Sequence, residues 1–159
     1  MNCEEFVLPT LRVALPLVKE SLRCLVNTVL FIRSLGGHLT TAPVRKRSEV
    51  LDIEYCVAEE ELDVSKFETT IVINFYVPRQ KKSTLWDILS QPFEEKAVFE
   101  RWKLPVNVVS FSEDEEEEVR AAKEQVRDRI RFICQKVNQK MDHLPPPPID
   151  RQIYHYEIS

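Results

Sequence analysis

The sequence contains one long segment with helical periodicity, Ser112–His143, which has no glycine or proline. As a continuous helix it would span roughly 45 Å, longer than a domain of this size is wide. Ser112 is a favourable N-cap, and Glu115 stands three positions later, where a capping-box partner belongs. Apolar side chains recur in steps of three and four residues at Val119, Ala122, Val126, Ile130, Ile133, Val137 and Met141. This spacing predicts a helix that buries one stripe against the rest of the fold.

The remaining surface of this helix is mostly charged, apart from Phe132 and Cys134. The acidic run Glu113–Glu118 lies at the start, where the helix dipole favours negative charge. Consecutive carboxylates on a helix point all round its axis, so this run predicts a solvated helix start and no metal site. Phe132 lies about 100° around the axis from Ile133. An apolar side chain outside the buried stripe is a candidate surface residue.

The composition indicates one soluble domain with its own core. The chain has 159 residues, 43% of them hydrophobic and 30% charged, with a net charge of -4. This charge balance argues against nucleic acid as a main partner. The longest apolar run, Leu25–Ile32, is too short to span a bilayer, and the N-terminus does not resemble a signal peptide. We therefore expect a cytoplasmic protein without stable membrane insertion.

Motifs for catalysis or cofactor binding are missing from the sequence. The two glycines, Gly36 and Gly37, are adjacent, which excludes a glycine-rich phosphate loop. The cysteines are far apart, and Cys24 and Cys134 fall among apolar residues, as buried small hydrophobic residues do. No histidine stands near Cys56 or Cys134 in the sequence to activate either thiol. We expect no enzymatic activity, no cofactor, no metal and no small-molecule substrate.

The order of expected elements predicts an α+β domain. Periodicity and composition predict strands at 5–13, 50–58, 69–77, 104–111 and 149–159, a helix from Leu17 to the glycine pair, and the long helix. Pro9 should push the first strand to a sheet edge or a bulge. The strands at 50–58 and 69–77 could pair as antiparallel neighbours. The expected architecture is an antiparallel sheet covered on one face by two long helices.

Three segments are predicted to be irregular or are ambiguous. His38–Glu49, with its basic cluster, and Pro78–Thr84 are predicted as solvated loops. Leu85–Trp102 has no clear periodicity, and its second half fits either a helix or an extended segment. Trp86 and Phe93 in this region are either binding anchors or side chains that fold back over the core. For Phe99 and Trp102, which lead into a strand, a core position is favoured.

Several segments in the same order resemble a known family. They are the helix Val18–Ser34, the strand LDIEY at 51–55, the segment Pro92–Phe111, and the closing LPPPPIDRQIYHYEIS at 144–159. Together they resemble the autophagy-related protein 101 family, small HORMA-domain proteins of the autophagy-initiating kinase complex. The resemblance covers most of the chain.

The resemblance implies a single HORMA domain over residues 1–159 with no catalytic activity. It implies a heterodimer in which this chain stabilises the HORMA domain of autophagy-related protein 13, with the long helix at the interface. Phe132 and its neighbours are the candidate dimer face: Arg131, Phe132, Cys134, Gln135 and Asn138. The family also carries a Trp-Pro-Phe finger that recruits downstream factors to the autophagosome formation site. The expected localisation is cytoplasmic, at the preautophagosomal structure.

The sequence departs from the family pattern in three places. At the finger, Pro92 and Phe93 match, but Gln91 stands at the tryptophan position, and nearby Trp86 is the candidate substitute. The region after Leu62 is short, so we expect the family's second helix to be reduced or absent. The chain stops at Ser159, where longer relatives continue.

Three functional hypotheses remain open at this point. The leading one is the non-catalytic HORMA subunit of the autophagy-initiation complex. A second is a checkpoint-type HORMA adaptor that wraps a partner peptide. The short stretch after Tyr156 argues against this hypothesis. A third is an enzyme that uses Cys56 or Cys134.

Overall fold

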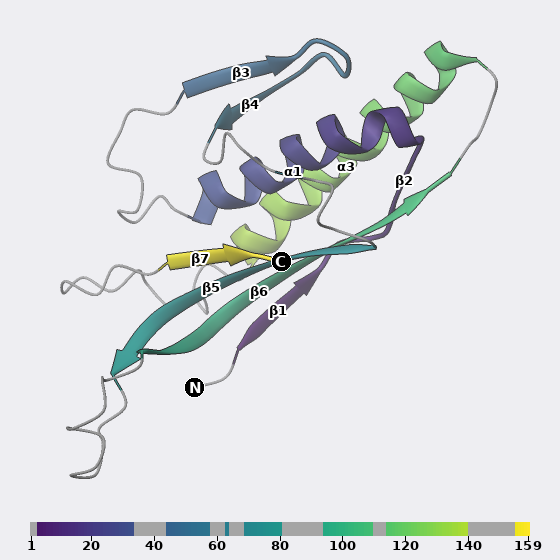
Figure 1. Ribbon diagram of the computed structural model, residues 1–159. Helices are drawn as coiled ribbons and strands as arrows, with labels where there is room; N and C mark the ends of the chain where they lie inside the picture. The colour runs from purple at the N-terminus through teal and green to yellow at the C-terminus, as the bar shows by residue number, and fades with distance from the viewer. Residues whose placement is uncertain are drawn as a thin grey trace.

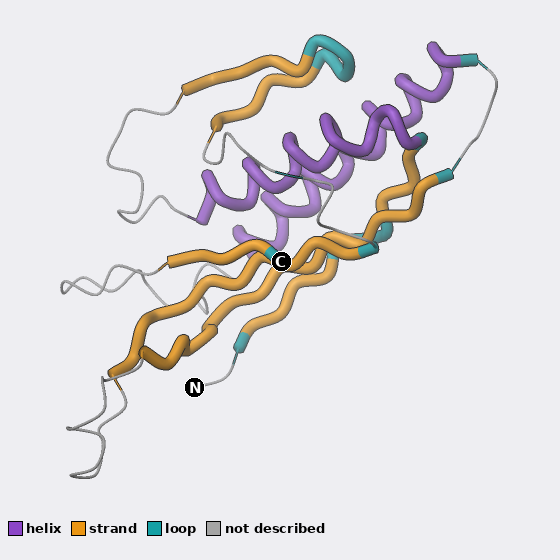
Figure 2. Tube along the Cα trace, in the orientation of Figure 1, coloured by secondary structure: helices purple, strands orange, loops and turns teal. Residues whose placement is uncertain are grey.

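The protein is built on one main sheet with two long helices on one face (Figures 1 and 2). The computed structural model describes residues 3–33, 44–57, 63, 69–80, 94–109, 114–139 and 155–159. Its elements are β1 (Glu4–Val7), β2 (Leu11–Val13), the short 3-10 helix η1 (Leu15–Leu17), α1 (Val18–Arg33), β3 (Val44–Ser48), β4 (Ile53–Val57), β5 (Thr70–Gln80), β6 (Glu94–Val108), α3 (Glu115–Gln139) and β7 (His155–Ile158). The predicted α+β architecture with helices on one face is confirmed.

The central strand of the main sheet is β6. The strand order is β1-β6-β5-β7, and β2 also pairs with β6. The pairs β5–β6 and β5–β7 are antiparallel, as predicted, whereas β1 and β2 run parallel to β6. The expected first strand is divided into β1 and β2 around Pro9, which cannot donate a backbone hydrogen bond. As the proline predicted, this strand lies at a sheet edge.

A separate hairpin, β3–β4, lies on the side of α1 away from the main sheet (Figure 1). The helix α1 contacts β4, and its buried side chains share one core with those of β5 and β6, so α1 lies between the hairpin and the main sheet. The alternation predicted for the segment 50–58 is confirmed, because Leu51, Ile53 and Tyr55 are buried while Asp52 and Glu54 are exposed. These inward side chains attach the hairpin to α1.

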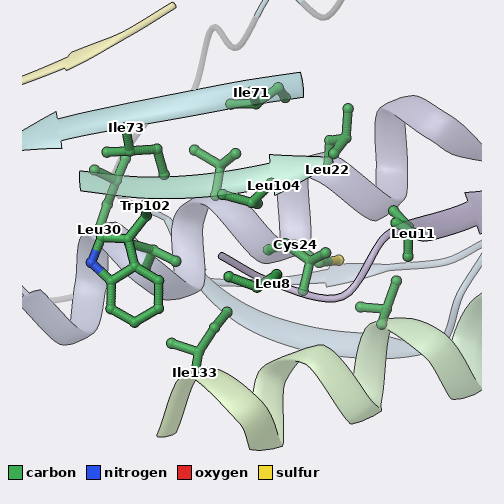
Figure 3. Close-up of a cluster of buried hydrophobic side chains, with 14 of the residues drawn as sticks. Leu8, Leu11, Leu22, Cys24, Leu30, Ile71, Ile73, Trp102, Leu104 and Ile133 are labelled. Carbon is green, nitrogen blue, oxygen red and sulfur yellow. The ribbon is translucent and has the colours of Figure 1, made fainter. Parts of the chain in front are cut away.

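The core lies between the main sheet and the helices, and Trp102 is its largest fully buried side chain (Figure 3). Trp102 is fully buried, and its ring stacks on Phe6 of the neighbouring strand at a centroid distance of 4.3 Å. Leu104 follows on the same face of β6, Ile71 and Ile73 come from β5, and the helices contribute a further set that includes Leu22, Cys24, Leu25, Leu30, Val126 and Ile133. The predicted core positions of Phe99 and Trp102 are confirmed.

Strand pairing differs from the sequence prediction in the first half of the chain. Within the predicted loop His38–Glu49, residues Val44–Ser48 form β3, so the loop prediction is wrong there. The strand β4 pairs with β3, and β5 pairs with β6 and β7, so the two segments expected to be neighbours are not paired. A strand that is solvated on both faces shows no alternation of apolar and polar residues. The charged run of β3 therefore did not indicate a strand in the sequence.

Within the ambiguous segment Leu85–Trp102, the described part is extended. Residues from Glu94 onward belong to β6, which continues to Val108 as one long strand. The strand β5 likewise runs to Gln80, beyond the predicted end at Val77 and into the predicted loop. The helix α1 ends at Arg33 within the described residues, and the glycine pair predicted to end it lies outside them. The length of both strands is set by strand pairing, since Pro78, Arg79 and Gln80 of β5 are paired with Lys96, Glu95 and Glu94 of β6.

Candidate protein-interaction surface

The start of α3 is capped by Asp114. The first helical hydrogen bond is donated by the Glu118 amide to the Asp114 carbonyl, and the Asp114 carboxylate accepts a second from the Glu116 amide at 3.0 Å. The prediction of Ser112 as the N-cap is therefore wrong by two positions. Aspartate is a favourable N-cap because its carboxylate accepts a hydrogen bond from a backbone amide in the first turn. The positive end of the helix dipole also stabilises its negative charge.

One stripe of α3 is buried, as its periodicity predicted. Ala122, Val126, Ile133 and Val137 are buried, and Val119 and Ile130 are partly buried against the same core. The predicted helix extends past Gln139 to Met141 and His143, which lie outside the described residues. Together these six side chains, at steps of three and four residues, pack the helix on the sheet and on α1.

Polar side chains attach one flank of α3 to the sheet edge. The Gln125 amide group accepts a hydrogen bond from the Arg12 amide at 2.8 Å and donates one to the Arg12 carbonyl at 2.6 Å. The guanidinium of Arg129 donates to the carbonyls of Pro9 and Thr10 at the bend between β1 and β2. The side chain of Gln125 thus completes the edge of β2 as a neighbouring strand would.

The opposite side of α3 faces solvent and contains most of the predicted dimer face. Arg131, Gln135 and Asn138 are exposed, and Phe132 and Cys134, on either flank of them, are partly buried. At helical spacing these five residues cover an arc of about 160°. Phe132 packs partly on the core, and the Lys136 ammonium lies 5.4 Å from its ring centroid. Phe132 is therefore at the margin of this exposed arc, and Gln135 is nearer its middle.

Charge pairing on this arc is weak. Arg131 lies 3.3 Å from Asp128, and the two side chains are 72% and 62% exposed. A solvent-exposed pair one helical turn apart contributes only about 0.3–0.5 kcal/mol. These side chains can therefore change partners at little cost.

The helix-free face of the main sheet is different, because its charges are matched across the strands. Glu5 on β1 lies 2.8 Å from the Lys103 ammonium, and its carboxylate also lies near Arg101. The hydrogen bond from Lys103 lowers the pKa of Glu5. Lys96 on β6 is 2.7 Å from Glu157 on β7, and that hydrogen bond raises the pKa of Lys96. The charges on this face are thus already paired with one another across neighbouring strands.

The predicted recruitment residues Trp86, Pro92 and Phe93, with Gln91 beside them, lie outside the described residues. Their points of attachment are described. Gln80 at the end of β5 is directly opposite Glu94 at the start of β6. Both strands extend past the helical layer at this end (Figure 1). The two described residues to which this segment is attached are thus adjacent, at the end of the sheet beyond the helical layer.

The cysteines show no arrangement for nucleophilic catalysis within the described part of the chain. Cys24 is fully buried, and burial raises the pKa of its thiol to about 12, which confirms its prediction as a core residue. Cys56 and Cys134 are partly buried, and neither side chain is hydrogen bonded to a base among the described residues. The same residues contain no cluster of three or more His, Cys, Asp or Glu side chains that could hold a metal.

A buried carboxylate on the central strand was not predicted from the sequence. Glu100 is fully buried, and its Oε2 accepts hydrogen bonds from Arg33 Nε at 2.8 Å and Trp102 Nε1 at 2.9 Å. A β-bulge between the Phe75 and Tyr76 pairings occurs at this point of the β5–β6 ladder. The signal in the sequence was a glutamate at the same alternation phase as Trp102 and Leu104. The hydrogen bond from Arg33 to Glu100 attaches the end of α1 to the sheet.

No helix within the described residues is long and apolar enough to cross a membrane. The protein is an α+β domain with a long helix whose outer face is exposed, mixed in charge and weakly paired.

Comparison with known proteins gives the family. The family model described as "Autophagy-related protein 101" matches residues 59–151, which is more than half of the chain. The chain is also 24% identical to autophagy-related protein 101 of Arabidopsis thaliana, over 100% of this chain and 87% of that protein. The chain belongs to the autophagy-related protein 101 family and has an autophagy-related role.

Proposed function

We propose that this chain is a single HORMA domain that acts as a non-catalytic scaffold in autophagy initiation. In this proposal it binds and stabilises the HORMA domain of autophagy-related protein 13 within the autophagy-initiating kinase complex. It works in the cytoplasm at the preautophagosomal structure. Membership of the autophagy-related protein 101 family supports the process, and the α+β fold with helices on one face is compatible with the domain type.

The observation that carries the proposal is the exposed arc on α3. A helix of 25 residues buries only four side chains in this domain. The exposed arc combines one guanidinium, two amides, a half-buried aromatic ring and a half-buried thiol. Arginine and aromatic side chains are enriched in protein interfaces because they combine large contact area with directional bonding.

Charge and size changes on this arc should abolish the heterodimer without unfolding the chain. The first variant is Phe132→Asp, which places a carboxylate at the margin of the proposed interface. Because Phe132 also contacts the core, a second variant, Arg131→Glu with Gln135→Arg, changes only exposed side chains. The charge control is Lys19→Glu on the exposed surface of α1. Co-purification with the partner HORMA domain is measured beside the melting temperature of each free chain.

We expect both interface variants to lose the partner while Lys19→Glu retains it. Size-exclusion chromatography with light scattering should show a heterodimer for the original chain and the control only. If the double variant co-purifies like the original chain, the dimer face is not on this arc. If the original chain itself does not bind the partner, the proposed function is wrong.

We propose further that the segment containing Trp86, Pro92 and Phe93 recruits downstream autophagy factors. Its attachment at the end of β5 and β6, beyond the helical layer, supports this role because a partner can reach it while α3 is occupied. Phe93→Ala combined with Trp86→Ala should leave melting temperature and heterodimerisation unchanged and reduce autophagic flux in cells. A large drop in melting temperature would instead place these side chains in the core.

A further inference from the structure

The hairpin β3–β4 presents an open strand edge with unbalanced positive charge. Within the described residues β3 pairs with β4 alone, so its outer edge has no neighbouring strand. An open edge exposes backbone donors and acceptors that an extended peptide can pair with. The strand reads VRKRS, and its first four residues are exposed.

Exposure on both faces makes this edge unusually accessible. Alternation would direct Val44, Lys46 and Ser48 toward α1, yet only Ser48 is buried. The strand therefore extends beyond the side of α1, and its side chains are accessible to solvent on both faces. Val44 is 56% exposed, which adds an apolar position beside the charges.

Two of the three basic side chains have no counter-charge among the described residues. Arg47 forms an ion pair with Asp52, which also lies 3.2 Å from the Lys123 ammonium. Arg45 and Lys46 form no ion pair with any described residue. Their cross-strand partners are the uncharged Cys56 and Tyr55. The unpaired positive charge is thus concentrated at Arg45 and Lys46, which are consecutive.

The turn end of the hairpin is attached to α1. The Ser48 hydroxyl donates a hydrogen bond to Glu20 on α1 at 2.9 Å, and it accepts one from the Leu51 amide. Asp52, at the hairpin turn, has a positive φ of 54°. Ile53 and Tyr55 of β4 are buried on the α1 side.

We propose that β3 is a docking edge for an extended acidic segment of another protein. The segment adds a strand beside Val44–Arg47, and adjacent carboxylates, one on each face of the new strand, meet Arg45 and Lys46. A second copy of this edge is a poor occupant because its own basic side chains would oppose those of the first. The proposed site is separate from the arc on α3 and does not require the HORMA partner.

The test uses the full chain and a fluorescein-labelled, end-capped peptide Thr-Val-Glu-Glu-Val-Thr. Its two controls are the same peptide with lysine in place of glutamate and the same peptide N-methylated at alternate residues, which blocks strand pairing. Binding is followed by fluorescence anisotropy at low salt. Vesicles of phosphatidylserine and phosphatidylcholine test the alternative that the charge serves an anionic membrane.

We expect saturable binding of the acidic peptide and none of the lysine or N-methylated peptides. Arg45→Glu with Lys46→Glu should weaken binding by at least about tenfold, which corresponds to the loss of two solvent-exposed ion pairs. Arg45→Gln with Lys46→Gln should do the same by neutralisation and guards against a folding defect. Arg120→Glu with Arg127→Glu on the exposed surface of α3 gives the same change in net charge and should have less than a twofold effect.

Four results would overturn the proposal. They are no binding of the acidic peptide, equal binding of the N-methylated peptide, equal loss in the α3 control, and binding of vesicles without binding of the peptide. The proposed heterodimer can still form in each of these cases, because the assay contains only this chain.

Discussion

The two helices share one layer but are packed differently. Of the 16 residues of α1, eight are buried, because the main sheet lies on one side of it and the β3–β4 hairpin on the other. Of the 25 residues of α3, four are buried. The longer helix therefore contributes fewer side chains to the core.

Because of this difference in burial, α1 mainly stabilises the core, whereas α3 also has a broad exposed surface. The fold would keep its core if α3 were altered along its outer arc, whereas almost any change on α1 reaches a packed neighbour. Arginines on the two helices show this clearly. Arg33 on α1 contacts a fully buried carboxylate, and Arg131 on α3 contacts a solvated one. Substitutions can test this difference, and loss of the buried ion pair should have the largest effect.

Replacing Arg33 with Met should destabilise the chain by about 4 kcal/mol, because the buried charge of Glu100 loses its cation. The two side chains are 16% and 0% exposed. The matched control is Arg131→Met, whose expected effect is within about 0.5 kcal/mol because its pair is solvated. Urea unfolding measures both. Similar losses in the two variants would contradict the difference between the helices.

Substitutions of two neighbouring side chains on α3 should differ in their cost to stability, because one side chain lies in the buried stripe and the other on its flank. Ile133→Ala should cost about 3 kcal/mol, since that side chain is fully buried. Phe132→Ala should cost about half as much, because part of its ring is exposed. Thermal and urea unfolding give the two values. If Phe132→Ala proves the more damaging, Phe132 belongs to the core and is a poor candidate for the dimer face.

Two glutamines on α3 provide a smaller version of the same test. Gln125→Ala removes both hydrogen bonds to the Arg12 backbone and should cost about 1 kcal/mol. Gln135→Ala changes an exposed side chain and should stay within about 0.5 kcal/mol. Hydrogen exchange should show faster exchange of the Arg12 amide in the first variant alone. Unchanged exchange there would mean that Gln125 does not protect the edge of β2.

The smallest effect concerns the helix-free face of the sheet. Because the hydrogen bond from Lys103 lowers the pKa of Glu5, this pair stabilises the fold above the unfolded pKa of the carboxyl. That stabilisation is lost as pH falls through the lowered pKa of the folded state. Lys103→Met should raise the pKa of Glu5 in an NMR titration and slightly reduce the dependence of stability on pH in the acidic range. An unchanged titration would show that the pair is not formed in solution.

The two helices also show which predictions the sequence could support. Their apolar stripes were predicted because a helix with one covered face must repeat its apolar residues every three or four positions. The buried Ala122, Val126 and Ile133 confirm this for α3. The core positions of Cys24 and Trp102 and the break at Pro9 also followed from local chemistry.

Strand pairing could not be predicted in the same way. The strand β3 has exposed charged residues and no alternation, so only its hydrogen bonds to β4 define it. The partner of β5 depends on which distant segment lies beside it, and no local pattern encodes that choice. Burial of Glu100 likewise depends on the distant Arg33 and on a bulge. The proposed dimer face remains a prediction that binding experiments must test.

The sequence by itself determined which segments are helical, where their apolar stripes lie, and which family the chain resembles. These properties depend on neighbours three or four residues away and on the order of segments along the chain. Tertiary structure alone decided that α1 is enclosed while the outer face of α3 is exposed. The physical reason is that the second layer over α1 is the β3–β4 hairpin, and its position depends on packing between residues far apart in the chain.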